Sequence, residues 1–420
     1  MKILFLTDNF PPEVNAPATR TYEHCIEWVS KGVDVTVITC NPNFPHGKLY
    51  KGYQNRLYSE ENIDGIRVIR VWSYMTANNG FFKRIIDYIS YAVMGFLVGL
   101  FQKFDLVVAT SPQFFTTWAG WGLSKVKNKP WIFELRDIWP ESLRSVGAMK
   151  NSKILNFLEK IELGLYRSSN QVIAVTDAFK TNLMNRNIDE SKISVITNGS
   201  NNELFKRKAK NKELLEKLNL QGKFIVGYIG THGMAHSLEF IVRSIKKVND
   251  EEIHFLFIGD GAVKEKVVTL SNDLELKNIT FLDSISKEMV PLYLSICDVS
   301  LAPLKMNDNF KTVIPSKIFE AAAMGKPIFL GVQGQAQEIL EKYNAGLCFI
   351  PEDESDFLQK LNEIKDKKKY RLYQEGCVRL AAAYDRKKLA KEMLVIMEKI
   401  ALTPSSVFVE TKSRIIHKSR

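Results

Sequence analysis

Residues 313–331, VIPSKIFEAAAMGKPIFLG, contain the repeating unit of an α/β fold, a short helix followed at once by an apolar strand. Pro315 and Ser316 are expected to open this helix, because proline is tolerated in a first turn and a serine hydroxyl can accept from free backbone N–H groups. Lys317 and Glu320 follow, three residues apart, so both can lie on one side of the helix. A helix start with a lysine and a carboxylate suits a nucleotide, since it attracts a pyrophosphate and accepts from ribose hydroxyls. The alternative is an ordinary capped helix.

Strand candidates alternate with helical patterns on both sides of this unit, which indicates parallel sheets of the doubly wound type. Their Val, Ile, Leu and Phe runs are nearly continuous, as is typical of strands covered on both faces. The expected strands are 2–7, 33–39, 105–110, 131–135, 171–176 and 193–197 in the first half, and 224–230, 253–259, 279–282, 299–304, 327–331 and 345–350 in the second.

The length of 420 residues and a hydrophobic content of 45% predict two domains with separate cores. A polar segment, 197–212, reads as the linker between them. We place the first domain at 1–205 and the second at 206–383. The last periodic helix, 384–400, is expected to return to the first domain, and 403–420 reads as a basic tail.

The net charge and the cysteine content limit which kinds of partner and which cellular compartment we expect for this protein. A formal net charge of +11 favours anionic partners, either nucleotide phosphates or an acidic membrane surface. Five cysteines without Cys-x-x-Cys spacing indicate reduced thiols in a cytosolic setting rather than disulfides or zinc. The first residues lack the pattern of a signal peptide.

Residues 81–101, FFKRIIDYISYAVMGFLVGLF, include an uncharged run at 88–100. This run is shorter than the ~20 residues that a membrane-spanning helix needs. With Lys83 and Arg84 at its start, the segment suits a helix at a membrane interface, or one lining a groove for a lipid acceptor. The alternative is a buried helix of the first domain.

Two glycine turns in the second half are candidates for phosphate binding. In GYIGTHGMAHS (227–237), Gly230 and Gly233 permit a tight backbone whose N–H groups can cradle an anion. Gly261 lies in a second turn, GDGA (259–262), at another strand end. Lys264 follows this turn and could reach the same anion, or it could be an exposed helix residue.

His232 and His236 are four residues apart, which raises the question of a metal site. The supporting ligands are absent from the sequence, because no HExxH order and no Asp-x-Asp occurs in the chain. We therefore predict no metal and no cofactor. Lysines and backbone N–H groups would have to stabilise a departing pyrophosphate.

Two segments of the first half carry further polar candidates. The loop in 5–20, FLTDNFPPEVNAPATR, offers Asn15, with a proline-stiffened surface loop as the alternative. In 133–147, FELRDIWPESLRSVG, a strand delivers Asp137 and Glu141 to its C-terminal end, where open α/β sheets bind ligands. The alternative for these carboxylates is a structural salt bridge with the arginines of the same segment.

The segment 312–327 resembles the donor-site helix of family 4 glycosyltransferases, whose pattern is Glu-x7-Glu followed by Ala-x-Ala-x-Gly-x-Pro. Glu320 matches the second glutamate, but Thr312 stands in place of the first. The resemblance runs from Met1 to about Ile400. It is strongest to bacterial O-antigen and capsule transferases, including N-acetyl-L-fucosamine transferases.

This resemblance implies an α/β architecture of two Rossmann-like, doubly wound domains facing a cleft, known as GT-B. It also implies a retaining, metal-independent mechanism in which the departing phosphate accepts the acceptor's proton. Family members carry an arginine and a lysine on the donor phosphates where this chain has Thr231 and His236, so Lys317 and Lys264 are the expected substitutes. An acceptor-side histidine of the family has no match here, and Asp137 and Glu141 are nearest to it.

We therefore expect a glycosyltransferase that moves a sugar, N-acetylated or 6-deoxy, from a nucleoside diphosphate such as UDP to a lipid-linked oligosaccharide. It would be cytoplasmic and peripheral at the inner face of the cytoplasmic membrane, with no nucleic-acid partner. A nucleotide-sugar 2-epimerase of the same architecture and an inert scaffold subunit remain alternatives. The predicted catalytic residues are Asp137, Glu141 and Thr312, and the predicted donor-binding residues are Asn15, Gly230, Thr231, His232, Gly233, His236, Gly261, Lys264, Pro315, Ser316, Lys317 and Glu320.

Overall fold

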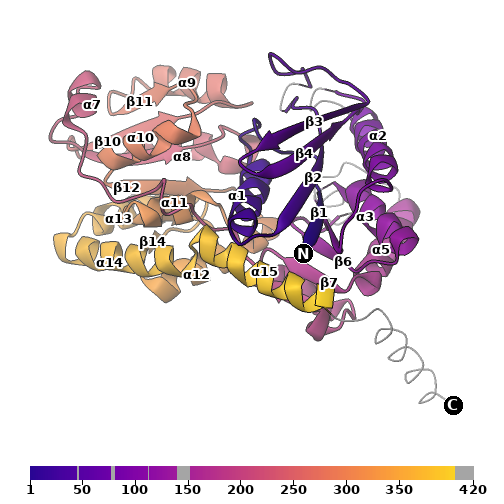
Figure 1. The fold of residues 1–420 in the computed structure, drawn as a ribbon. Coiled ribbons are helices and arrows are strands. Elements are labelled where there is room, and N and C mark those ends of the chain that lie inside the picture. Colours follow the sequence, from indigo (N-terminus) through magenta and orange to yellow (C-terminus); the bar gives the residue numbers. More distant parts are fainter. Residues whose placement is uncertain (45–46, 77–80, 112, 140–151, 403–420) are drawn as a thin grey trace. The chain divides into compact units, whose positions relative to one another are not determined.

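The computed structural model describes residues 1–44, 47–76, 81–111, 113–139 and 152–402 (Figure 1). Its internal contacts divide the chain into two compact units. Unit 1 comprises Met1–Thr197 with Lys387–Arg420, and unit 2 comprises Asn198–Arg386. The sequence analysis placed the corresponding boundaries at 205 and 384.

Unit 1 contains an eight-stranded sheet in the order β3-β4-β2-β1-β5-β6-β7-β8, which is parallel except for the antiparallel pair β3-β4. The register pairs Leu4 of β1 with Thr36 on one side and Val107 on the other. The strands are β1 (Lys2–Leu6), β2 (Asp34–Cys40), β3 (Tyr58–Ile63), β4 (Ile66–Val71), β5 (Leu106–Thr110), β6 (Trp131–Leu135), β7 (Gln171–Ala174) and β8 (Ile193–Val195).

Helices cover both faces of this sheet, which explains its nearly continuous apolar strands. Alternate strand residues point to opposite faces, so Leu4 and Leu6 join one core cluster while Ile3 and Phe5 join the other. Leu389 and Met393, from the last helix, pack into the second cluster. The helices are α1 (Ala16–Ser30), α2 (Phe81–Gly99), α3 (Phe114–Lys127), α5 (Ser152–Ser168), α6 (Asp177–Asn185) and α15 (Arg386–Leu402), with the 3-10 turn η1 (Glu190–Lys192).

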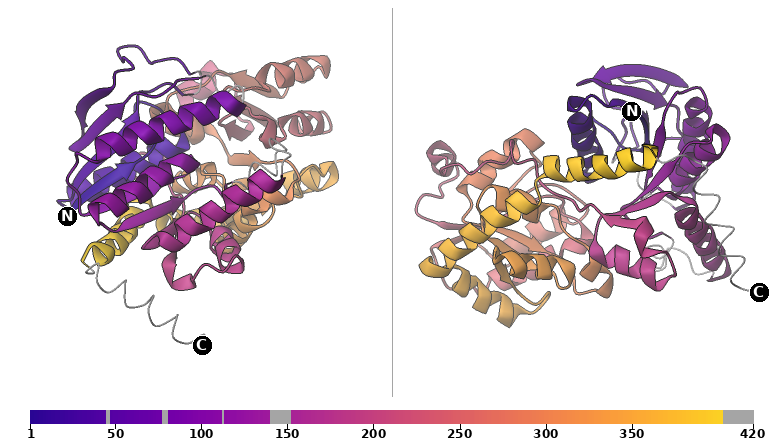
Figure 2. Two further views of the ribbon diagram at one scale, coloured as in Figure 1. Left: turned by 90° about the vertical axis from the view of Figure 1, so that its right-hand side faces the viewer. Right: turned by 60° about the horizontal axis from the view of Figure 1, so that its bottom comes forward.

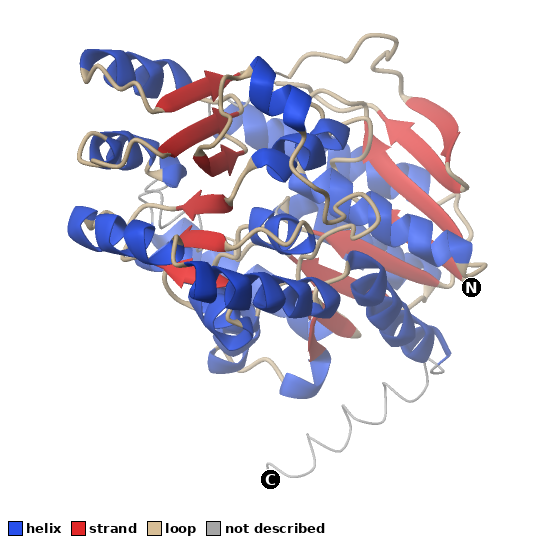
Figure 3. Ribbon diagram, turned by 90° about the vertical axis from the view of Figure 1, so that its left-hand side faces the viewer, coloured by secondary structure: helices blue, strands red, loops and turns tan. Residues whose placement is uncertain are grey.

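Unit 2 contains a six-stranded parallel sheet in the order β11-β10-β9-β12-β13-β14. Figure 3 shows its strands lying between helices. The strands are β9 (Phe224–Ile229), β10 (Ile253–Ile258), β11 (Ile279–Leu282), β12 (Val299–Pro303), β13 (Ile328–Gly331) and β14 (Gly346–Cys348). The helices are α7 (Lys212–Lys217), α8 (Leu238–Ile245), α9 (Lys264–Asp273), α10 (Val290–Ile296), α11 (Lys317–Ala323), α12 (Gln335–Tyr343), α13 (Glu354–Ile364) and α14 (Lys367–Ala383), with the 3-10 turns η2 (Met234–His236), η3 (Lys287–Met289) and η4 (Asp308–Thr312).

The expected fold class, two α/β units with doubly wound parallel sheets, is confirmed, and each predicted strand is present within a few residues. The sequence analysis missed the hairpin β3-β4. β3 is an edge strand whose burial alternates between exposed and half-covered residues, so it lacks the apolar run that marked the buried strands. The apolar segment 81–101 forms α2, which is buried along one side only.

Candidate functional site

The most promising site in unit 2 lies where the strand order reverses. From β9 the chain moves outward to β10 and β11, and then returns to β12 on the other side of β9. The carboxyl ends of β9 and β12 are therefore neighbours from which the chain departs in opposite directions. Open α/β sheets bind ligands at such a switch point.

The turns that follow β9 and β10 are bound to each other at this edge. His232 N donates to Asp260 O at 2.8 Å, and Val263 N donates to His232 O at 3.0 Å. The contact is so close that a Cβ on Gly259 would lie 1.9 Å from Gly230 O, and one on Gly261 would lie 2.6 Å from His232 O. Both glycines also have positive φ, 146° and 151°. Only glycine fits these positions, so the two predicted turns form one rigid backbone platform.

Lys317, at the start of α11, brings its amine under this platform. A Cβ on Gly230 would lie 3.0 Å from Lys317 Nζ, and the same Nζ lies 3.9 Å from the ring centroid of Tyr228. Nζ is buried and has no hydrogen-bond partner in the described parts of the chain. Burial lowers the pKa of Lys317 to about 7, although Glu320 opposes the shift. A buried amine without a hydrogen-bond partner is costly for the fold, and such perturbed groups are typical of functional sites.

The two histidines of the β9 turn are neutral at pH 7. Burial, with Lys264 and Lys317 nearby, lowers the pKa of His232 to about 4. Burial and Lys317 lower the pKa of His236 to about 4 as well. Both ring nitrogens of His232 are buried without a hydrogen-bond partner within the described ranges. These histidines can therefore donate neutral N–H groups to a ligand but supply no charge.

Within residues 1–402, leaving out the gaps named above, no group of three or more His, Cys, Asp or Glu side chains could hold a metal ion. Metal independence of the enzyme stays a prediction.

Glu320 of α11 binds a lysine that the sequence analysis did not consider. Lys287, in η3, forms an ion pair with Glu320, and its Nζ also lies 4.9 Å from the ring centroid of Phe205. The side chain of Glu320 is 13% exposed, so it is largely but not fully buried. Lys317 and Glu320 thus share the helix, as expected, but each has a different neighbour.

The expected serine cap of α11 is wrong. Ser316 occupies the N-cap position with helical backbone angles, and its hydroxyl makes no capping hydrogen bond. The first turn uses backbone acceptors instead, because Ile318 N donates to Pro315 O and Phe319 N donates to Ser316 O. The Ser316 hydroxyl is therefore not used to hold the helix.

The remaining predicted donor residues lie around the same edge of unit 2. Thr231 O accepts from the Tyr228 hydroxyl, and Gly233 precedes η2. Lys264 Nζ donates to Asp283 Oδ1 at 2.6 Å and to Leu282 O at 3.2 Å, so it is engaged at the end of β11. The structure thus holds Lys264 in an ion pair, whereas the Lys317 amine has no hydrogen-bond partner among the described residues.

Thr312 ends η4, and its hydroxyl donates to Asn309 O at 3.0 Å. A cavity of about 300 Å³ lies beside this turn, lined by residues 305–308, 310–311, 332–333 and 351. Thr312 follows the lining residues in sequence but is not one of them. That its side chain faces a donor sugar stays a prediction.

Unit 1 has its own switch point, between β1 and β5. Asp8 follows β1 and Gln113 follows β5, and Gln113 Nε2 donates to Asp8 Oδ2. Burial, with Asp87 and Glu13 nearby, raises the pKa of Asp8 well above its ordinary value. Burial likewise raises the pKa of Asp87 in α2 to about 7. This carboxyl cluster was missed, because its members are far apart in sequence.

Asn15, the predicted polar residue of the first loop, has a structural task. Its Oδ1 accepts from Ala18 N at 2.9 Å, so it caps α1, and its Nδ2 donates to Asn9 Oδ1 at 2.7 Å. The loop before α1 is thereby fixed to the helix.

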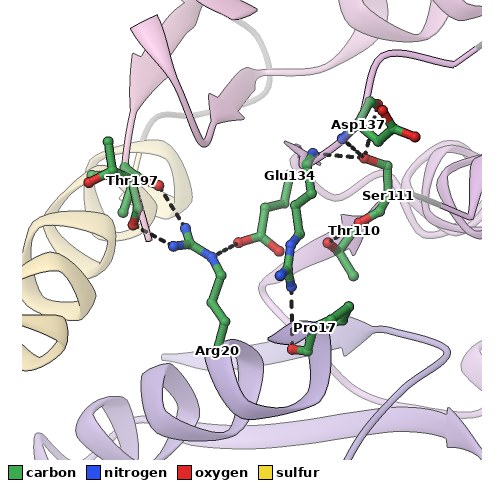
Figure 4. Close-up of polar contacts among 9 residues, drawn as sticks. Pro17, Arg20, Thr110, Ser111, Glu134, Asp137 and Thr197 are labelled. Carbon is green, nitrogen blue, oxygen red and sulfur yellow. Dashed lines mark hydrogen bonds and ion pairs between the residues drawn. The ribbon is translucent and has the colours of Figure 1, made fainter. Parts of the chain in front are cut away.

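A buried ion pair lies beside the predicted acceptor segment (Figure 4). Arg20 Nε donates to Glu134 Oε1 at 3.0 Å, and both side chains are almost fully buried. The other Arg20 nitrogens donate to the carbonyls of Ile196 and Thr197. Burial works to raise the pKa of Glu134, yet Arg20 and Arg136 hold it below its ordinary value. Removing either partner would leave a buried charge, so this pair fastens α1 to the end of the sheet.

Asp137 lies beside Ser111, whose Oγ accepts from the backbone N–H of Asp137 at 3.2 Å (Figure 4). Arg136 Nη1 donates to Pro17 O at 3.3 Å. Glu141 and Arg144 lie outside the described residues, so their predicted roles are untested.

Comparisons with known proteins agree with this architecture. Residues 17–204 match the family described as Glycosyltransferase Family 4, and residues 210–375 match Glycosyl transferases group 1. One relative is WcaI of Escherichia coli strain K12, whose name describes a colanic acid biosynthesis glycosyl transferase. It is 23% identical to this chain over 335 residues, which cover 77% of this chain and 82% of WcaI.

Two solved structures have the same fold. Sucrose-phosphate synthase from Thermosynechococcus elongatus superposes with a TM-score of 0.75 at 16% identity, covering 95% of this chain and 98% of the synthase. HepE from Anabaena, in complex with UDP-glucose, superposes with a TM-score of 0.70 at 15% identity, covering 95% of this chain and all of HepE (100%). The family matches, which together span most of the chain, confirm the resemblance, and this chain belongs to the family 4 glycosyltransferases of the GT-B type.

Proposed function

We propose that this glycosyltransferase is retaining and metal-independent, and that it moves a sugar from UDP to a lipid-linked oligosaccharide in polysaccharide synthesis. The name of WcaI, a colanic acid enzyme, supports a role in building a surface polysaccharide. UDP-glucose bound to HepE supports a UDP-linked donor.

One observation carries the donor assignment: the buried Lys317 amine, which has no hydrogen-bond partner among the described residues and lies beside the Gly230 turn. A diphosphate on the platform of the β9 and β10 turns would meet backbone N–H groups, the neutral rings of His232 and His236, and this amine. Charge-assisted hydrogen bonds of this kind are the strong ones. Glu320 would accept from the ribose hydroxyls, in exchange for part of its contact with Lys287.

The proposed reaction needs no protein nucleophile. The bond between the anomeric carbon and the phosphate oxygen breaks as the acceptor oxygen bonds to that carbon from the same face. The acceptor's proton passes to the departing phosphate oxygen. Lys317 and the backbone N–H groups would stabilise the charge that develops on the diphosphate.

The donor sugar is proposed from the departure at Thr312. A threonine offers one hydroxyl and a methyl group, whereas a glutamate would accept from several sugar hydroxyls. A sugar with fewer hydroxyls, N-acetylated or 6-deoxy, fits such a pocket, with UDP-N-acetyl-L-fucosamine as the first candidate. On the acceptor side we propose Asp137 and Glu141, and we add Asp8, because its Oδ1 is buried without a hydrogen-bond partner among the described residues.

A lipid-linked acceptor would place the enzyme at the inner face of the cytoplasmic membrane. Across the residues that the structure describes, no helix combines the length and apolar character needed to cross a bilayer. We propose peripheral attachment on the ground of the acceptor alone, because a lipid-linked saccharide is presented at the membrane surface.

A thermal-shift screen of nucleotides and nucleotide sugars tests the donor site, because a ligand that binds only the folded state raises the melting temperature. UDP and UDP-N-acetylated deoxysugars should stabilise the protein more than ADP or GDP derivatives. Incubation of each hit with and without a lipid-linked acceptor then separates transfer from epimerisation. A change in the sugar without any acceptor would contradict the proposal.

A further inference from the structure

Three helices of unit 1, α2, α3 and α5, form one layer over one face of the sheet (Figure 2, left). Each contributes to the same core cluster, through Tyr91 of α2, Leu123 of α3 and Leu165 of α5. The helices α2 and α3 are in contact, as are α3 and α5. The sides of these helices that face neither the sheet nor each other therefore form one outer surface, which we call the α2–α3–α5 surface.

The outer side of α2 is apolar. Ile86, Ile89, Val93 and Leu97 are 52%, 41%, 51% and 46% exposed. Their spacing of three or four residues places them on one side of the helix. After Asp87, α2 contains no charged residue. A surface helix of a globular domain normally presents polar side chains to water. The exposed side of α2 is apolar instead.

The apolar character continues onto the neighbouring helices and the end of α2. The further exposed side chains are Phe101, Trp121, Val126, Ile154 and Phe157. Phe101, just after α2, is 86% exposed. Large exposed apolar side chains on three adjacent helices are the composition expected of an interaction surface.

Exposed basic side chains occur on the same three helices and in the residues directly after them. The exposed ones are Lys83, Arg84, Lys103, Lys125, Lys127, Lys129, Lys153 and Lys160. The three helices carry three carboxylates. Glu159 and Glu162 bind Arg186, and Asp87 is half-buried. The outer surface is therefore apolar and positively charged.

We propose that the α2–α3–α5 surface docks unit 1 onto an anionic lipid bilayer, with the apolar side of α2 among the acyl chains and the lysines at the headgroups. An amphipathic surface of apolar and basic residues has the chemistry of such an interface. A second copy of this chain fits less well, because a two-fold interface would place these lysines against one another. This inference deepens the proposed function and rests on its lipid-linked acceptor for its purpose, but vesicle binding is measured without turnover.

Cosedimentation of the full chain with phosphatidylcholine vesicles, with and without phosphatidylglycerol, tests the proposal. The double variant Val93→Gln with Leu97→Gln should lose roughly 30-fold in partitioning, because two half-exposed side chains no longer enter the bilayer. The triple variant Lys125→Gln, Lys127→Gln and Lys129→Gln should lose roughly 100-fold on anionic vesicles, at about five-fold for each lysine, and little on neutral ones. Glutamine keeps the helices, since its helix propensity is good.

The matched control is Leu372→Gln with Val378→Gln. These α14 side chains are similarly exposed but lie in unit 2, so this variant should partition like the wild type. Retained UDP binding and a retained melting transition show that each variant is folded. Equal partitioning of the α2 variant and the wild type would overturn the proposal, as would a wild type that ignores anionic vesicles.

A wild-type dimer that the α2 substitutions dissociate, without vesicle binding, would also overturn the proposal and assign the surface to a second copy. Failure of UDP binding with intact vesicle binding would count against the proposed donor site alone.

Discussion

Replacing Lys317 with methionine should stabilise the free protein and weaken its binding of UDP. The lysine amine is buried beside the Gly230 turn and over the ring of Tyr228, without a hydrogen-bond partner in the described ranges. Methionine keeps most of the side-chain volume and removes the charge. If Lys317 stabilised the fold, its removal would destabilise the free protein. If Lys317 serves a ligand, its removal would weaken only the binding of that ligand.

The magnitude follows from the pKa of Lys317. The fold lowers it from 10.5 to about 7, mainly through burial. At about 1.4 kcal/mol per pKa unit, holding this lysine protonated costs about 5 kcal/mol of folding free energy. The unfolded chain keeps the proton up to pH 10.5, so between pH 7 and 10.5 it binds more protons than the folded chain. Stability of the wild type therefore rises with pH across this window, and the cost is complete below about pH 7.

Lys317→Met should thus raise the free energy of unfolding by about 5 kcal/mol at pH 6, and the gain should shrink toward zero near pH 10. Denaturant unfolding at several pH values measures this difference. The control is Lys266→Met in α9, whose amine is on the surface and paired with Glu239. That substitution should change stability by less than about 0.5 kcal/mol at every pH.

Binding of UDP gives the second half of the test. The bound diphosphate should restore the charge of Lys317, so at pH 8 the wild type should take up about one proton per UDP. UDP contributes none at this pH, because its last phosphate pKa is about 6. Calorimetry in buffers of different ionisation enthalpy measures the uptake. Lys317→Met should show none and bind UDP roughly 10–100-fold more weakly. A destabilised variant at pH 6, or wild-type binding without proton uptake, would refute the reasoning.

Three further predictions concern the donor site. Glu320→Gln should weaken UDP binding roughly 10–100-fold while the melting temperature changes little, because glutamine can still accept from Lys287 but without a charge; unchanged affinity in calorimetry would remove Glu320 from the site. EDTA should leave the transfer rate intact, since the chain has no Asp-x-Asp sequence, and a loss that manganese restores would show that the enzyme needs a metal. Thr312→Glu should lower turnover of UDP-N-acetylated deoxysugars, because a glutamate would find fewer sugar hydroxyls to accept from than it would on UDP-glucose; faster transfer from UDP-glucose than from these sugars by the wild type would sink the proposed donor.

The sequence by itself determined the architecture and predicted where the proposed donor site lies. Apolar runs separated by segments of helical periodicity indicate doubly wound sheets. Strands that helices cover on both faces are apolar along their whole length, whereas half-exposed strands alternate with polar residues. Glycines at strand ends marked the turns after β9 and β10, since backbone that must pass so close to its neighbour excludes every other residue. The helix with Lys317 and Glu320 could also be predicted from the sequence, because a pair of residues within one helical turn is a local feature.

Only the tertiary structure decided which groups meet. Lys287 reaches Glu320 across 33 residues, and Gln113 reaches Asp8 across 105. Whether α2 is core or surface was also open in the sequence, and the structure shows one side buried and the other exposed. Periodicity tells which residues share a face of an element, but the partner of that face depends on strand order and helix packing. Charges, pKa shifts and exposed patches follow from those long-range contacts, because they depend on what surrounds a side chain rather than on its neighbours in the chain.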